Sequence, residues 1–378
     1  MSEKTILLLG ADSCKTLPLA FSLRKKGYRV VGLFQSRLNY GYSCRYIQKR
    51  LVFRDLYDIA RSEPFLQSIF ETYRFDAVIP LEDVCAELVS RMGLPGFPSL
   101  SVFQVGFDKK SLMRLCERKA YPHPKTYFPE DGLPDDLHFP LIVKPDITSG
   151  ARGMAVVYDR EELERVSAQT FAEFGPYHLQ EFIRPGGRQI EVQLFVDKEG
   201  SLVQSSVIEK YRWYPVQGGS SCCNVSAAHS AVVNVCHRIL KDLQWVGFAD
   251  FDTIENPDTG ELMVLELNPR LPACIKTAFV SGVDWGDILA AEYMGESHAC
   301  YQEKGGEWLR YLGFEILWFL HSPDRFRTKP SWFRFFGKHI HYQDMGMGFD
   351  PLPWFTGTLG NIVKILNPEF RRKKSGME

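Results

Sequence analysis

Hydrophobic and polar positions follow two different patterns along the chain. In residues 1–108, short apolar runs at 5–9 and 28–34 flank an amphipathic stretch at 17–26, and another run lies at 75–80. This alternation of buried strands with helices predicts a parallel sheet covered by helices. The turn after the first strand lacks the Gly-x-Gly-x-x-Gly spacing, so a dinucleotide-binding fingerprint is absent.

Polar side chains follow two of these predicted strands. Ser13 lies in the turn after the first strand, and Glu82 and Asp83 lie between the run at 75–80 and a helix predicted over 84–92. Ligands of open α/β sheets bind beyond the carboxyl ends of the strands, so these three residues are candidates for holding a small polar substrate. The alternative is that the two acids only serve the first turn of the helix, where its dipole favours them.

The middle of the chain changes to the alternation typical of antiparallel strands. Such strands are predicted at 139–145, 155–158, 178–183, 189–196 and 202–210. The first two are joined by a loop of small residues, 148–154, and Lys144 precedes that loop. Backbone amides of a small-residue loop can approach phosphate oxygens closely, and a lysine supplies a matching charge. Glycine-rich hairpin turns are common, so the loop alone has an ordinary explanation too.

A helix predicted over 109–119 places a second lysine in an unusual position. Asp108 is its predicted N-cap, which puts Lys109 in the first turn. The dipole disfavours a cation there, so Lys109 indicates either a phosphate partner or a solvated surface charge.

The stretch 247–270 contains two apolar runs separated by turn-forming residues, which predicts an antiparallel hairpin. Because alternate side chains share a face, Asp252, Glu266 and Asn268 converge if the strands pair. Two carboxylates and an amide oxygen suit Mg²⁺, and Arg270 follows close enough to meet an anion. The alternative is an acidic, solvated hairpin.

Bulk composition narrows the classes of function. The length of 378 residues predicts two or three domains, and 45% hydrophobic content is ordinary for a globular protein. The formal net charge of −1 argues against nucleic acid as the main partner. Nine scattered cysteines favour reduced thiols in a cytoplasmic protein, and Cys222 and Cys223 are adjacent residues that seldom pair. No stretch approaches the roughly 20 apolar residues of a membrane span.

The C-terminal part, 296–378, is rich in aromatic residues and basic near its end. From Asp324 onward there are ten Lys and Arg against five Asp and Glu. The run 359–366 followed by the basic residues 371–374 resembles a segment that makes weak peripheral contact with an anionic membrane. The interpretation favoured by the sequence is an aromatic subdomain that packs on the preceding domain and closes an acceptor site.

The run from Lys109 to Arg270 resembles an ATP-grasp domain. The resemblance rests on the order and spacing of VKP, SGARGM, QEFI, IEVQ, FD and ELNPR. It is nearest to the carbamoyl-phosphate-synthase-like and carboxylate–amine ligase branch, which includes D-aspartate ligase-like proteins. The resemblance implies an α/β and α+β fold: a Rossmann-like pre-ATP-grasp domain at 1–108, a two-lobed ATP-grasp domain with antiparallel sheets at 109–295, and a C-terminal extension at 296–378. A small lobe at about 121–183 bears the lid.

The resemblance also implies how a nucleotide is held. Lys109 and Lys144 bind the α- and β-phosphates, and Glu191 accepts from the ribose. The lid over the phosphates includes Ser149, Gly150, Gly153 and Met154. Adenine meets Glu181, Phe182 and Ile183, mostly through their backbone.

The implied chemistry centres on the hairpin. Asp252, Glu266 and Asn268 hold magnesium, although the family usually has Glu where Asp252 stands. Arg270 stabilises the acyl phosphate and the tetrahedral intermediate. Either Lys210 or Arg212 lies near the γ-phosphate, and the sequence does not decide between them.

The implied activity is an ATP-dependent carboxylate–amine ligase that uses two Mg²⁺ or Mn²⁺ ions and releases ADP and phosphate. The expected partners are a small-molecule carboxylate and an amine, and a second copy of the chain is a candidate partner in a homodimer. Two alternatives stand beside this: a nucleotide-binding, membrane-associated regulator without turnover, and a carboxylase that forms carboxyphosphate.

Overall fold

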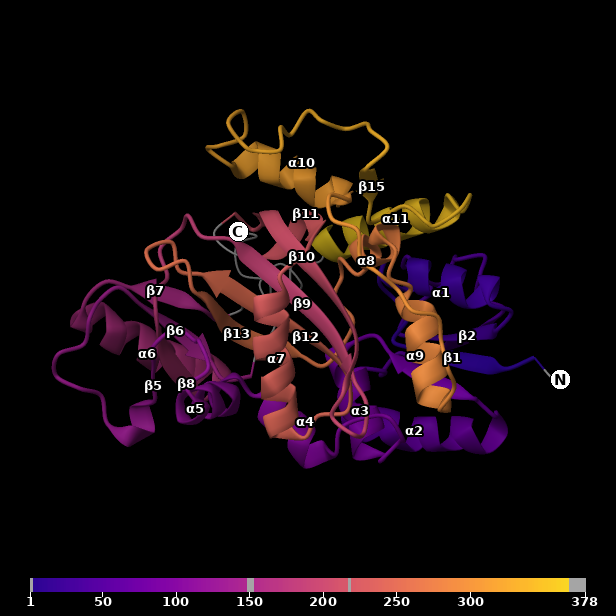
Figure 1. Ribbon diagram of the computed structural model, residues 1–378, viewed down its shortest axis with the longest axis horizontal. Coiled ribbons are helices and arrows are strands. Elements are labelled where there is room, and N and C mark those ends of the chain that lie inside the picture. The colour runs from indigo at the N-terminus through magenta and orange to yellow at the C-terminus, as the bar shows by residue number, and fades with distance from the viewer. Residues whose placement is uncertain (1–2, 148–152, 217–218, 367–378) are drawn as a thin grey trace.

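The computed structural model describes residues 3–147, 153–216 and 219–366, which form three sheets with helices packed on them (Figure 1). The N-terminal sheet is parallel, with the order β3-β2-β1-β4. Its strands are β1 (Thr5–Leu9), β2 (Arg29–Phe34), β3 (Lys49–Val52) and β4 (Ala77–Pro80). The predicted parallel sheet is therefore confirmed.

Four helices accompany this sheet: α1 (Thr16–Lys25), α2 (Ile59–Thr72), α3 (Asp83–Arg91) and α4 (Leu100–Phe107). The sequence pattern predicted α1 and α3 but neither α2 nor α4. Pro64 inside α2 argues against a helix there, and α4 has a nearly continuous apolar sequence that lacks the usual signature of an amphipathic helix.

The central sheet has seven strands in the order β13-β12-β9-β10-β11-β14-β15. Its strands are β9 (Gln189–Val196), β10 (Leu202–Tyr214), β11 (Ser220–Ala227), β12 (Gly247–Glu255), β13 (Leu262–Asn268), β14 (Trp308–Arg310) and β15 (Ile340–Tyr342). All neighbours are antiparallel except β14 and β15. The expected extension thus contributes two strands to this sheet.

Helices cover one side of the central sheet. Apolar side chains of β9, β12 and β13 pack with those of α4, α5 (Lys109–Lys119) and α7 (Ser230–Leu243) in one buried cluster. Asp108 caps α5 by accepting from the backbone amides of Lys110 and Ser111, as predicted. This packing fixes Lys109 at the start of α5, beside β13.

A smaller antiparallel sheet forms a separate lobe at the left of Figure 1, with the order β5-β8-β6-β7. Its elements are β5 (Thr126–Tyr127), the short 3₁₀ helix η1 (Pro129–Asp131), β6 (Leu141–Pro145), β7 (Ala155–Val157), α6 (Arg160–Phe174) and β8 (Tyr177–Glu181). Two antiparallel sheets facing one another give the expected two-lobed fold, so the fold class is confirmed.

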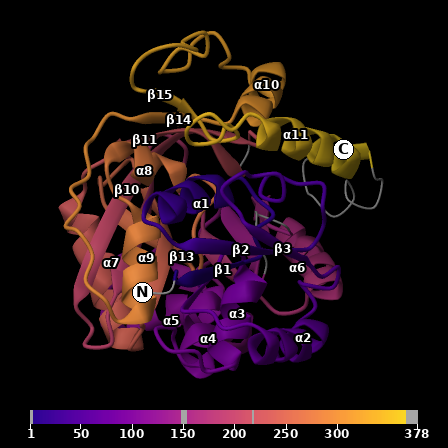
Figure 2. The same cartoon turned by 90° about the vertical axis from the view of Figure 1, so that its right-hand side faces the viewer.

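The remaining helices tie the ends of the chain together. They are α8 (Lys276–Ser281), α9 (Trp285–Met294), α10 (Leu312–His321) and α11 (Leu352–Leu366). Apolar residues of α9 share a buried cluster with α1 and β1, while α10 and α11 lie together at one end of the molecule (Figures 1 and 2). None of the helices in the described part of the chain is long and apolar enough to span a membrane.

Candidate functional site

A charged cavity of about 260 Å³ lies between the small lobe and the central sheet. Four cationic side chains and four carboxylates line it. The cations are Lys109, Lys144, Lys210 and Arg270, and the carboxylates are Glu191, Asp250, Asp252 and Glu266. Asn268 and Met154 line it as well. The structure therefore brings nine of the 19 predicted site residues to one place.

The pairing of three strands produces this convergence. Asp252 lies opposite Glu266 on β13 and opposite Glu191 on β9, and Asp250 lies opposite Asn268. Directly opposed residues point to the same face of a sheet, so these oxygen atoms gather above β12. The predicted hairpin is present, and the predicted approach of Asp252, Glu266 and Asn268 is found.

Two predicted phosphate-binding lysines reach the cavity from different lobes. Lys109 Nζ lies 3.2 Å from Glu266 Oε2, and buried Lys144 donates to Gln180. Burial lowers the pKa of Lys144 to about 8 because desolvation disfavours its charge. Burial opposes ionisation of Glu266 too, but Lys109 and Lys144 outweigh it and lower the pKa of that carboxyl to about 2. The two lysines thus create a positive environment at the hairpin.

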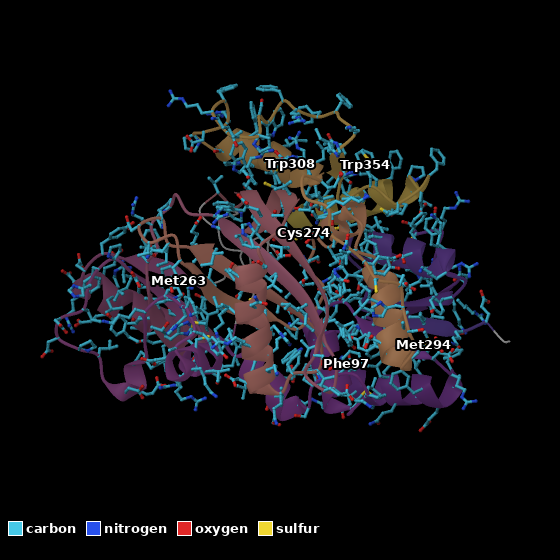
Figure 3. The ribbon with its side chains drawn as sticks, viewed as in Figure 1. Phe97, Met263, Cys274, Met294, Trp308 and Trp354 are labelled. Carbon is cyan, nitrogen blue, oxygen red and sulfur yellow. The ribbon has the colours of Figure 1, made fainter. Side chains whose placement is uncertain are left out.

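Lys210 lies at the centre of the acidic group. Its Nζ is 2.8 Å from Glu191 Oε2 and also donates to Asp252. Burial by itself would lower the pKa of Lys210, but the two carboxylates outweigh it and raise that pKa well above its usual value. Glu191 further accepts from Cys274 Sγ at 3.1 Å, and Figure 3 shows Cys274 near the middle of the molecule. Glu191 is therefore surrounded by Lys210, Cys274 and Gln193.

Arg212 does not reach the cavity. In a regular strand, Lys210 and Arg212 would share a face because they are two positions apart. Register shifts on either side of Arg212 interrupt its pairing with β11, so this alternation does not hold here. Arg212 is buried against Glu315 of α10, with Nη2 2.7 Å from Oε1. Of the two residues left open for the γ-phosphate, only Lys210 lines the cavity.

Arg270 connects the hairpin to the N-terminal sheet. Its Nε lies 3.1 Å from Asp83 Oδ1, its Nη1 3.8 Å from Asp250 and its Nη2 3.3 Å from Asn268 Oδ1. Asp250 is 1% exposed, and its Oδ1 has no hydrogen-bond partner. Burial raises the pKa of Asp250 well above its usual value, and Glu191 and Asp252 add to the effect.

A second cavity, of about 460 Å³, adjoins the charged one, and Ser220, Ser221 and Ala273 line both. The predicted substrate residues Ser13, Glu82 and Asp83 line this second cavity. Ser13 Oγ donates to Glu82 at 3.2 Å, and buried Lys15 lies 3.2 Å from the same carboxyl group. The three residues thus lie around one cavity, and their role in holding a substrate stays a prediction.

Other walls of the second cavity were not predicted from the sequence. Asp12 accepts from Tyr57 at 2.8 Å and from Asn39 at 2.6 Å, and burial raises its pKa. Tyr311 and Asn361 come from the C-terminal part of the chain, with Asn361 Nδ2 2.9 Å from Tyr311 Oη. Asp12 shares the turn of Ser13 and was available to the same argument, whereas no local signal marks Tyr311 or Asn361.

The predicted adenine and lid residues are placed only in part. Glu181 ends β8, and its backbone amide donates to Lys125, while that of Phe182 donates to Pro140. Glu181, Phe182 and Ile183 are not among the described residues that line the charged cavity. Ser149 and Gly150 lie outside the described residues.

Gly153, the next lid residue, has a φ of +71°, and a Cβ there would lie 2.6 Å from the Phe174 ring. This position therefore requires glycine.

The oxygen donors fit magnesium if the metal shares them with a phosphate. No three His, Cys, Asp or Glu residues in the described part of the chain could hold a metal by themselves. Mg²⁺ commonly takes one or two carboxylates and completes its shell with water and substrate phosphates. Asp252, Glu266 and Asn268 could supply that protein share, and the partnerless Asp250 Oδ1 beside them indicates that the cavity accepts a further positive group.

Comparison with known proteins agrees with this geometry. The family model for the carbamoyl-phosphate synthase L chain, ATP binding domain, matches residues 132–284. The carbamoyl phosphate synthase large chain, C-terminal section, of Methanopyrus kandleri is 26% identical over 177 residues, which cover 43% of this chain and 32% of that protein. The chain spans about a third or less of the length of the curated relatives it matches.

Solved structures share the fold at low sequence identity. A biotin carboxylase complex from Campylobacter jejuni has a TM-score of 0.68 and 17% identity over 80% of this chain and 74% of that one. An L-amino acid ligase from Bacillus licheniformis has a TM-score of 0.60 and 16% identity over 78% and 76%. These likenesses show that the chain has the ATP-grasp fold, and the family match places an ATP-binding domain of this kind at residues 132–284.

Proposed function

We propose that the protein is an ATP- and magnesium-dependent ligase that activates a small carboxylate as an acyl phosphate and joins it to an amine. The observation that carries this proposal is the pair of adjoining cavities. The charged cavity has the cations and oxygen donors for a triphosphate and its metal. The second cavity is lined by carboxylates and hydroxyls, with no Lys or Arg among the described residues that line it.

The balance of charge in the first cavity supports a metal–nucleotide complex. Four cations already face four carboxylates there, so a bare triphosphate would leave excess negative charge. Two divalent cations would offset that charge. Bound at Asp252, Glu266 and Asn268, they would supply electrostatic stabilisation of the phosphoryl group.

The side chains have distinct tasks in the proposed reaction. Lys109, Lys144 and Lys210 hold the phosphates, so that a substrate carboxylate oxygen attacks the γ-phosphorus and ADP leaves. Arg270, at the junction between the hairpin and Asp83, stabilises the acyl phosphate and the oxyanion that forms when the amine attacks. Phosphate then leaves, and the amide forms after the nitrogen loses a proton.

The second cavity suits the amine better than it suits a phosphorylated substrate. Asp12, Glu82 and Asp83 line it, and carboxylates attract a cationic ammonium group. Asp83 Oδ1 lies 3.1 Å from Arg270 Nε, so this carboxylate links the second cavity to the arginine of the charged cavity.

Transfer of isotope from carboxylate to phosphate tests the proposal. The full-length protein is incubated with ATP, Mg²⁺ and an amino-acid panel in which each carboxylate carries ¹⁸O. We expect ADP release that requires two substrates, with one ¹⁸O in the released phosphate. Glu266→Gln is expected to abolish turnover, while Glu261→Gln, an exposed residue next to the same hairpin, leaves it unchanged.

Two results would contradict the ligase. ADP formation that depends on bicarbonate would identify a carboxylase that forms carboxyphosphate. Tight ATP binding without turnover across the whole panel would indicate a nucleotide-binding regulator.

A further inference from the structure

The C-terminal part of the chain carries most of the large apolar side chains that the described residues expose. Of 20 such side chains, 13 lie between residues 316 and 366. They are Ile316, Leu320, Phe326, Phe333, Phe336, Met345, Phe349, Leu352, Phe355, Leu359, Ile362, Val363 and Leu366. Scattered apolar residues are normal on a surface, but a concentration of this kind marks an interaction site.

Helix α11 turns its apolar stripe away from the protein. The exposed residues Leu352, Phe355, Leu359, Ile362 and Leu366 recur every three or four positions, which places them on one face. Ordinary surface helices bury such a face. In α11, Gly357 and Gly360 lie on the buried face instead, and the side chains of the apolar stripe are between 48% and 70% exposed.

Small residues fix this orientation. A Cβ on Gly357 would lie 2.2 Å from the ring of Tyr40, and one on Gly360 would lie 2.5 Å from the carbonyl oxygen of Leu38. The helix backbone therefore packs directly on the N-terminal domain. Asn361 on α11 also donates to Tyr311, so the orientation is held by specific contacts.

A second apolar group, which we call the α10 segment, comprises residues 316–338. Its exposed side chains include Phe326, Phe333 and Phe336, the last being 91% exposed. Five cations, Arg325, Arg327, Lys329, Arg334 and Lys338, accompany them against the single acid Asp324. Figures 1 and 2 both place the α10 segment and α11 at the same end of the molecule, and Figure 3 shows side chains projecting outward there.

We propose that the apolar stripe of α11 and the α10 segment form a docking surface for an anionic lipid bilayer. Aromatic and aliphatic side chains beside cations match the interface of such a membrane, where rings enter the headgroup region and cations meet lipid phosphates. A second copy of the chain is a poorer occupant, because a two-fold contact would bring the same cations face to face. The surface stands on described residues, independently of the basic tail 367–378.

Docking would also bring the second cavity close to the membrane. Gly357 and Asn361 of α11 line that cavity, while the opposite face of the helix carries the exposed stripe. One helix thus separates the proposed acceptor site from the bilayer. This consequence rests on the ligase proposed above, whereas docking itself does not.

Vesicle sedimentation tests the surface. Purified full-length protein is mixed with phosphatidylcholine vesicles with or without phosphatidylglycerol, at low and at high salt. We expect binding to the anionic vesicles that salt weakens. The double variant Leu359→Ser, Ile362→Ser should reduce the binding constant by about tenfold or more, and each of Arg327→Gln and Lys329→Gln by about fivefold.

Matched variants keep the test specific. Tyr158→Ser with Phe171→Ser removes two apolar side chains of similar exposure on the small lobe, and should leave vesicle binding unchanged. Thermal melts check that every variant folds. Glu266→Gln should bind vesicles like the natural protein, so loss of turnover and loss of docking are separate results.

Two outcomes would overturn the docking surface. One is equal sedimentation of the natural protein and the α11 double variant. The other is a dimer, seen by light scattering without any vesicle binding, that the same substitutions dissociate.

Discussion

At the scale of single residues, Lys144 makes nucleotide binding sensitive to pH. It is buried beside Gln180, and burial lowers its pKa to about 8. In the free protein its charge is present below that pH and is lost above it, whereas bound phosphates favour the charged form. We expect the dissociation constant for ATP to be flat below pH 8 and to rise by up to about tenfold per pH unit above it.

Calorimetric titration with ATP between pH 6.5 and 9.5 measures this dependence. Lys144→Arg should remove the inflection, because a guanidinium stays charged throughout the range. Lys119→Arg, at a half-exposed position on α5, should keep it. An inflection that persists in Lys144→Arg would assign the titration to another group.

Arg270 lies where the proposed oxyanion forms, so its replacement should affect chemistry more than binding. In Arg270→Lys, the planar fork that reaches Asp83 and Asn268 is lost while a positive charge remains. We expect kcat to fall by about 100-fold or more, with the dissociation constant for ATP changing only slightly. Single-turnover kinetics and equilibrium binding separate the two effects, and an equal loss in both would contradict the assignment.

The sequence alone was enough to predict which side chains lie close together where this depends only on the alternation of residues along one hairpin. Asp252, Glu266 and Asn268 belong to one hairpin, so alternation and a turn were enough to bring them together. Lys210 and Arg212 could not be separated, because the register shifts beside Arg212 depend on pairing with β11. The approach of Arg270 to Asp83 joins residues 187 positions apart, and only the assembled sheets produce it.

At the scale of secondary structure, α10 is held to the central sheet by buried charges. Glu315 on α10 is 0% exposed and accepts from both Arg212 on β10 and Arg310 on β14. Glu315→Gln would remove the negative charge and leave two buried guanidinium groups without compensation. We expect it to lower the free energy of unfolding by about 3–5 kcal/mol.

Denaturant titration measures this cost. Glu87→Gln disrupts the more exposed pair of Glu87 with Arg91 on α3 and should cost less than about 1 kcal/mol. If both variants lowered the free energy of unfolding equally, the buried Glu315 cluster would contribute no more to stability than a surface ion pair does.

The elements themselves were predictable to different degrees. Strong alternation identified β9, and an N-cap at Asp108 identified the start of α5. The pairing of β14 with β11 was not predictable, because three residues that follow a long irregular stretch carry too little pattern. This pairing brings the C-terminal part of the chain into the central sheet and places Tyr311 beside the second cavity.

At the scale of the whole molecule, the second cavity has walls from the N-terminal part of the chain, the central sheet and the C-terminal helix. The size and shape of such a site depend on the distances between the elements that form its walls. Gly357 allows α11 to lie close to the N-terminal part of the chain, because the helix contacts Tyr40 directly at this position. The C-terminal part was expected to close an acceptor site, but neither the sequence order nor the resemblance identified α11 as the helix that forms a wall of this cavity.

A single methyl group tests whether this assembly determines acceptor use. In Gly357→Ala, the added Cβ would meet the Tyr40 ring at 2.2 Å, so α11 must move away from the N-terminal domain. Gly313→Ala is the matched control, since its Cβ would meet nothing within 4 Å on α10. We expect Gly357→Ala to raise KM for the acceptor amine severalfold while leaving ATP binding unchanged, because the charged cavity has no wall from α11 among its described lining residues. Steady-state kinetics with the acceptor varied at saturating ATP measures the shift, and an unchanged acceptor KM would remove α11 from the acceptor site.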